Sequence, residues 1–111
     1  MKVNEMASKL TLRVATTQGD LDREVTGCYI SDLLSDVMGN ARDGEVWITL
    51  QTHPNIVAIA TLKNLSGIII TNNRKPEEET LKKAEAERVP IMLSSSSTFE
   101  TGGSLYRLLR C

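Results

Sequence analysis

The segment GIIIT at residues 67–71 constrains the fold most strongly, because three consecutive isoleucines leave it no polar face. A strand with one face in water alternates apolar and polar residues, whereas a strand inside a parallel sheet is covered on both faces and is apolar throughout. We therefore predict that residues 67–71 form a central strand of a parallel sheet.

Predicted strands and helices alternate on both sides of this segment. Strands are predicted at residues 45–50, EVWITL, and at residues 90–94. Pro54 suits the first position of a helix over NIVAIATLKN. Pro76 and the glutamates after it suit another helix start, because carboxylates stabilise the positive end of the helix dipole. A last helix is predicted over residues 98–110, with Ser97 and Glu100 at capping-box spacing.

These short connections between strands and helices determine the fold class. A strand joined to the next through a helix requires a parallel crossover. The predicted fold class is therefore α/β, a three-layer sandwich around a mostly parallel sheet of about four strands. The 111 residues fit a single domain, residues 1–111, of ordinary size.

The N-terminal part of the chain contains further elements. Apolar residues at helical spacing predict a helix over residues 3–10, and TLRVAT at residues 11–16 predicts a strand. A brief extended piece is expected at residues 25–26. A second helix is then predicted, with Ser31 and Asp32 at its start and Gly39 at its C-terminal end. Its apolar stripe consists of Ile30, Leu33, Leu34, Val37 and Met38.

Charge and composition argue against several classes of partner. The 13 basic and 14 acidic residues are interspersed, whereas a nucleic-acid binder concentrates basic residues on one face. The longest apolar stretch, about residues 56–65, is interrupted by polar side chains and is shorter than the roughly 20 residues of a membrane span. The N-terminus lacks the apolar core of a signal peptide, and Cys28 and Cys111 make no disulfide framework. We expect a cytoplasmic protein that binds neither nucleic acid nor membranes.

The motifs of common catalytic sites are missing from the sequence. Neither a GxxxxGK[ST] phosphate-binding loop nor a GxGxxG turn occurs. His53 is the only histidine, and the cysteines do not stand at metal-ligand spacing from it. Cys28 and His53 are conceivable as a nucleophile and its base, but nothing in the sequence indicates that they meet. We expect no enzymatic activity, no cofactor and no metal.

Polar loops follow the predicted strands, at residues 16–18, 51–53, 71–73 and 94–97. Ligands of parallel α/β sheets bind beyond the carboxyl ends of the strands, where helix N-termini attract anions. Short polar side chains there commonly cap helices and fill turns, and they also suit a phosphorylated small molecule or a nucleotide. The candidate ligand-binding residues are Gln51, Thr52, His53, Thr71, Asn72, Asn73, Ser95 and Ser96, with Arg74 as the one nearby positive charge.

Two further features have structural interpretations. Gly102 and Gly103 lie inside the predicted last helix, where each glycine costs roughly 1 kcal/mol relative to alanine. Close packing of this helix on a neighbour, within or between subunits, would explain the pair. Trp47 lies in a predicted strand and is expected in the core.

The segment at residues 45–103 resembles the DRTGG domain, read in order as EVWITLQTHPNIVAIATLKNLSGIIITNNRKPEEETLKKAEAERVPIMLSSSSTFETGG. The resemblance covers nearly the whole chain, including the predicted helix around SDLLSDVMGN. This domain accompanies CBS-domain pyrophosphatases and some phosphotransacetylases, and it is similar to the N-terminal domain of the HPr kinase/phosphorylase. The resemblance implies a MurF-N-terminal-like α/β fold and a regulatory, dimer-forming role. It implies no chemistry, which in the kinase belongs to a separate P-loop domain.

The motif that gives the family its name is only partly kept. The resemblance aligns the family's Asp-Arg with Thr52-His53, and its Thr-Gly-Gly with Thr71-Asn72-Asn73. Only Thr71 is identical. Asparagine tolerates left-handed backbone better than most residues, so the two replaced glycines make physical sense. The loss of Asp-Arg removes a charged pair from any ligand site that the resemblance implies.

Three functions from different classes follow from these observations. The first is a non-catalytic regulatory or ligand-sensing module that self-associates as a homodimer and binds a phosphorylated small molecule or nucleotide. The second is a pure protein-interaction subunit of an enzyme encoded elsewhere, with no small-molecule ligand. The third, an enzyme that uses Cys28 or His53, is disfavoured by the missing motifs.

Overall fold

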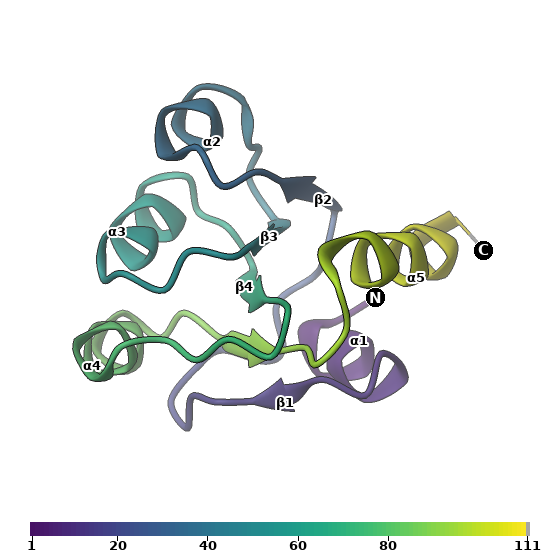
Figure 1. The fold of residues 1–111 in the computed structure, drawn as a ribbon, viewed down its shortest axis with the longest axis horizontal. Coiled ribbons are helices and arrows are strands. Elements are labelled where there is room, and N and C mark those ends of the chain that lie inside the picture. The colour runs from purple at the N-terminus through teal and green to yellow at the C-terminus, as the bar shows by residue number, and fades with distance from the viewer. Residues whose placement is uncertain (111) are drawn as a thin grey trace.

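One five-stranded sheet organises the protein, in a computed structural model that describes residues 1–110 (Figure 1). The strands are β1 (Arg13–Val14), β2 (Gly27–Ile30), β3 (Glu45–Thr49), β4 (Gly67–Ile70) and β5 (Ile91–Leu93). Their order is β1-β5-β4-β3-β2; β2 to β5 are parallel, and β1 is antiparallel to β5. The predicted α/β fold with a mostly parallel sheet is confirmed, with five strands rather than about four.

Strand β4 occupies the centre of the sheet, and all its residues are buried. Ile68 and Ile70 belong to the core on one face, whereas Ile69 belongs to the core on the other. Figure 1 shows the first face covered by α2 (Leu34–Asn40), α3 (Asn55–Leu62) and α4 (Glu78–Glu87). The second face is covered by α1 (Val3–Lys9) and α5 (Thr98–Arg110). The three-layer prediction is therefore confirmed.

The segment between Gly27 and α2 differs from the sequence-based prediction. Ile30 is predicted to belong to the apolar stripe of a helix that starts at Ser31 and Asp32, but it ends strand β2, and α2 begins only at Leu34. Hydrogen bonds tie the intervening segment to β3. The indole N–H of Trp47 donates to the carbonyl of Ser31 over 2.8 Å, and Thr49 Oγ1 donates to Asp32 over 2.9 Å. Ser31 and Asp32 therefore hold the end of β3, and neither side chain caps α2.

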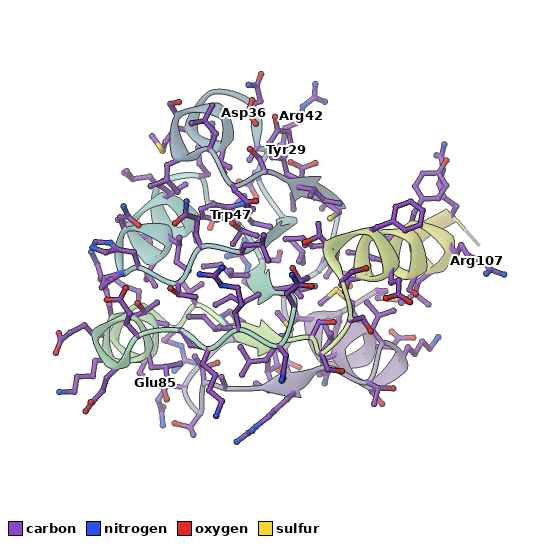
Figure 2. All side chains as sticks on the ribbon, viewed as in Figure 1. Tyr29, Asp36, Arg42, Trp47, Glu85 and Arg107 are labelled. Atoms are coloured by element: carbon purple, nitrogen blue, oxygen red, sulfur yellow. The ribbon has the colours of Figure 1, made fainter. Side chains whose placement is uncertain are left out.

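The direction of β1 overturns the placement of one loop. Because β1 runs antiparallel to β5, residues 16–18 leave it at the end of the sheet where β5 begins. The prediction that this loop joins the loops after β3, β4 and β5 is therefore wrong. The Glu85 carboxylate of α4 accepts backbone N–H bonds there from Thr17 and Gln18, over 2.9 and 2.7 Å (Figure 2). Both bonds lower the pKa of the Glu85 carboxyl, and the bond from Gln18 contributes most.

The remaining helices begin and end close to their predicted positions. Ser97 and Glu100 form the predicted capping box, in which Ser97 Oγ accepts the N–H of Glu100 over 3.1 Å. Lys82, one turn further along α4, lies 3.9 Å from Glu78 and 3.8 Å from Glu79. Within residues 1–110, no helix combines the length and the apolar character that a bilayer span requires.

Candidate functional site

The carboxyl edge of the sheet gathers three of the polar loops. Strands β3, β4 and β5 are parallel neighbours, so the loops that follow them leave the sheet at one end. This arrangement confirms the prediction that residues 51–53, 72–73 and 95–96 lie along a common edge. Hydrogen bonds then divide these loops into two groups.

The loops after β4 and β5 are bound to each other. The backbone N–H of Asn72 donates to the carbonyl of Ser96 over 2.8 Å, and that of Asn73 donates to the carbonyl of Ser94 over 2.9 Å. The N–H of Ser96 donates to Ser94 Oγ over 3.1 Å. These three amides are engaged within the protein. The side chains of Asn72, Asn73, Ser95 and Ser96 remain exposed, so they are the groups that face solvent here.

Thr71 lies beneath this turn and is fully buried. Its hydroxyl oxygen is 2.7 Å from that of Thr98, and the hydroxyl oxygen of Ser94 is 2.8 Å from that of Thr101. Both contacts tie the ends of central strands to α5. The Thr71 hydroxyl therefore holds the turn in place and does not face solvent.

The loop after β3 is bound to other partners. Gln51 Nε2 donates to the carbonyl of Asp32 over 2.9 Å. The carbonyl of Thr52 accepts the Thr80 hydroxyl over 2.6 Å and the N–H of Glu77 over 3.2 Å. His53 is exposed, and its Nδ1 accepts the backbone N–H of Asn55 over 3.1 Å. This loop thus supports the starts of α3 and α4.

A hollow of about 180 Å³ opens beside the β4 and β5 loops. We call it the basic hollow, and it is lined by Thr11, Arg13, Asn73, Arg74, Lys75, Leu93, Ser94 and Ser95. Its three cationic side chains are exposed, and none of them forms an ion pair or a side-chain hydrogen bond with any residue that the structure describes. No carboxylate lines it.

Sequence reasoning found Asn73, Arg74 and Ser95 at this edge but missed Arg13 and Lys75. Arg13 reaches the edge because β1 pairs antiparallel with β5, which sets Arg13 opposite Leu93. If β1 ran parallel to β5, Arg13 would lie at the other end of the sheet. Knowledge of the direction of β1 would therefore have placed Arg13 at this edge.

The conceivable Cys28–His53 pair is not assembled. Cys28 packs with the core under α1 and α5, whereas His53 leads into α3 on the other face of the sheet. Burial, with a smaller contribution from Glu45, raises the pKa of the Cys28 thiol to about 12. A thiol with such a pKa stays protonated at neutral pH and is a poor nucleophile. No group of three or more His, Cys, Asp or Glu side chains within residues 1–110 could hold a metal ion.

A second surface feature lies between β2 and α5. A hollow of about 360 Å³ there is lined by Thr26, Gly27, Cys28, Ile30, Gly102, Tyr106, Leu109 and Arg110. A Cβ atom at Gly102 would lie only 2.7 Å from Ile30 Cδ1, so this glycine permits the close packing of α5 on β2. Gly103 has no atom within 4 Å of its Cβ position and opens to solvent. Phe99 and Tyr106, on the same helix, are 87% and 60% exposed.

Comparison with known proteins identifies the family. The model of the DRTGG domain matches residues 5–108. The chain belongs to the DRTGG domain family. A search of curated proteins gives no match.

Among solved structures, this DRTGG domain is similar to the CBS and DRTGG domains of the regulatory region of a Clostridium perfringens pyrophosphatase. That structure is a complex with the activator diadenosine tetraphosphate. The match has a TM-score of 0.70 at 11% sequence identity and covers 94% of this chain and 45% of that one. The chain thus spans less than half of the matched protein, and the similarity shows the shared fold.

The turn at Thr71-Asn72-Asn73 keeps a backbone that glycine would favour. The φ angles of Asn72 and Asn73 are 62° and 57°, in the left-handed region. Both residues stand where the resemblance aligns the family's two glycines. Asparagine is one of the few residues other than glycine that adopt this conformation readily. The asparagines therefore preserve the turn that binds the β4 loop to the β5 loop.

This geometry predicts how Asn73 responds to substitution. Asn73→Ala should lower the free energy of unfolding by about 1 kcal/mol relative to Asn73→Gly, because alanine is strained in left-handed backbone and glycine is not. The Asn73 side chain makes no hydrogen bond within the described residues, so backbone strain dominates the difference. Urea denaturation of the two variants measures it. Equal stability of Asn73→Ala and Asn73→Gly would contradict the assignment.

Proposed function

We propose that this DRTGG domain is a non-catalytic regulatory module that binds a phosphorylated small molecule or a nucleotide at the carboxyl edge of its sheet. The observation that carries the proposal is the basic hollow. There, exposed polar side chains from two mutually bound loops lie beside three cations that have no partner among the described residues. Unpaired cations beside hydroxyl and amide groups suit an anionic ligand.

Rigid loops strengthen this interpretation. The Asn72 and Asn73 amides fix the β4 loop on the β5 loop, so little conformational entropy is lost when a ligand binds between their side chains. A regulatory role agrees with the family, because the matched DRTGG domain belongs to the regulatory region of its pyrophosphatase. That region is complexed with a nucleotide activator, which makes nucleotides the first ligands to test here.

The absence of catalysis is part of the proposal. A phosphoryl-transfer site needs a phosphate cradle and a group that positions the nucleophile. The sequence has no GxxxxGK[ST] loop, and the Cys28 thiol is held protonated by burial. The chain would therefore bind a ligand without converting it chemically.

A thermal-shift screen tests the ligand. A nucleotide at tenfold above its Kd should stabilise the folded protein by about 1.4 kcal/mol and raise the Tm by roughly 5 °C. Ser95→Asp should abolish the shift by placing a negative charge in the basic hollow, where Ser95 is exposed. Ser35→Asp, on the exposed surface of α2, is the matched control and should keep it. The absence of any shift with nucleoside monophosphates, nucleoside diphosphates and dinucleoside phosphates would contradict the proposal.

We further propose that the domain forms a twofold homodimer through the exposed face of α5. Phe99, Gly103 and Tyr106 lie at helical spacing on that face, and Ile30, next to Gly102, is 49% exposed. A twofold contact brings the same patch of both copies together, and two glycine-bearing helices can approach closely. Burial of two large aromatic side chains from each copy would supply the driving force.

Two glycine substitutions test this interface. Gly103→Leu should weaken the dimer because its side chain would stand between the helices, although the monomer has room for it. Gly39→Leu, in α2, also meets no atom within 4 Å and is the matched control. Both changes favour helix formation, so loss of the dimer would not result from unfolding. Sedimentation equilibrium at tens of micromolar protein measures the effect, and a monomeric wild-type protein would refute the dimer.

The alternative function is a protein-interaction subunit with no small-molecule ligand, docked on an enzyme encoded elsewhere. The exposed aromatic face of α5 would suit such a partner as well as a second copy. The two functions differ in the ligand screen, because only the sensing module is stabilised by a nucleotide.

A further inference from the structure

A second hollow of about 250 Å³ shares lining residues with the basic hollow. We call this the apolar hollow, and it is lined by Arg13, Val14, Ala15, Lys75, Pro76, Leu81 and Leu93. Arg13, Lys75 and Leu93 line both hollows, so the two adjoin beside the β1–β5 pair. Each alone is smaller than the roughly 300–1,000 Å³ of typical small-molecule sites, whereas the two joined reach the lower end of that range.

The two hollows differ in chemistry. The basic hollow has two guanidinium groups, an ammonium group, the hydroxyls of Thr11 and Ser95 and the amide of Asn73. Arginine can bind phosphate oxygens through paired N–H donors. The apolar hollow has walls of half-buried aliphatic side chains and a proline ring, with no hydroxyl or carboxylate. A flat, weakly polar ring fits such walls better than a charged group does.

Nearby carboxylates are engaged elsewhere. Glu78 and Glu79 lie within 3.9 and 3.8 Å of Lys82. The Glu85 carboxylate accepts N–H bonds from the loop after β1. These three carboxylates therefore have partners of their own, and none of them pairs with Arg13, Arg74 or Lys75.

Thr11 lines the basic hollow from the end of α1. Its φ angle is 54°, in the left-handed region that a β-branched residue avoids. Thr11 follows the C-terminal cap of α1, a position where glycine is usual. The N–H of Leu12 donates to the carbonyl of Ala7 over 2.9 Å, so the left-handed Thr11 closes the end of α1.

We propose that the two hollows form one nucleotide site, in which the basic hollow holds the phosphates and the apolar hollow holds the base. The proposal rests on the ligand-sensing function above and makes it specific. Arg13 and Arg74 bind phosphate oxygens, Lys75 lies where the two hollows meet, and Leu81 and Leu93 contact the ring. The site draws its residues from β1, from the connection between β4 and α4, and from β5, so a bound nucleotide links the sheet edge to α4.

Isothermal titration calorimetry of the full chain at low salt tests the assignment, with ADP, pyrophosphate and adenosine as probes. ADP should bind most tightly, because it occupies both hollows. Arg13→Gln and Arg74→Gln should each weaken ADP binding roughly tenfold, the effect of one lost charge-assisted contact. Arg107→Gln, which removes the same charge from the outer surface of α5, is the matched control and should leave ADP binding unchanged (Figure 2). Thermal midpoints without ligand verify that the variants fold.

Three results would overturn the assignment, and they differ in what they leave standing. Unchanged ADP affinity in both arginine variants would place the ligand elsewhere and keep the sensing function. Pyrophosphate binding as tight as ADP binding would remove the base from the apolar hollow. Binding of none of the three probes would refute the nucleotide site, and with a blank thermal-shift screen it would refute the sensing function as well.

Discussion

The burial of β4 on both faces is the constraint on which the rest of the structure depends. Ile68, Ile69 and Ile70 are fully buried, and their side chains divide between two separate cores. Each core needs helices to cover it, so the chain must cross the sheet repeatedly and run its central strands in parallel. Parallel strands end at one edge. The common edge of polar loops is thus a direct consequence of an apolar strand at the centre.

The antiparallel β1 adds a third cation to that edge. The loops after β4 and β5 provide neutral side chains together with Arg74 and Lys75. Several backbone N–H groups of these loops are hydrogen-bonded within the protein. Pairing of β1 with β5 adds Arg13 and Thr11 from the other end of the chain. The candidate ligand site therefore combines a local feature, the turn at Asn72 and Asn73, with a long-range one.

The parts of the fold that the sequence predicted are those determined locally. The buried strand at residues 67–71, the capping box at Ser97 and the helix after Pro54 each depend on residues close together in the chain. The left-handed turn was also foreseeable, because the resemblance aligned Asn72 and Asn73 with two glycines. Clustering of the β4 and β5 loops followed from the parallel sheet alone.

The missed parts depend on tertiary contacts. Ile30 fits a helical stripe by its spacing, but hydrogen bonds from β3 to Ser31 and Asp32 keep that segment extended. The direction of β1 is decided by its pairing with a strand near the other end of the chain, so no local pattern reveals Arg13 at the site. Similarly, the partners of Gln51 and Thr52 on other elements show that these candidates support neighbouring segments.

The proposed ligand site lies at the carboxyl edge of the sheet, beside β1. Titration of ¹⁵N-labelled protein with ADP, followed through the backbone amide resonances, tests it most directly. We expect the largest shifts at Thr11, Arg13, Lys75 and Ser95, around the two hollows. Shifts confined to β2 and α5, or no shifts at millimolar ADP, would contradict it.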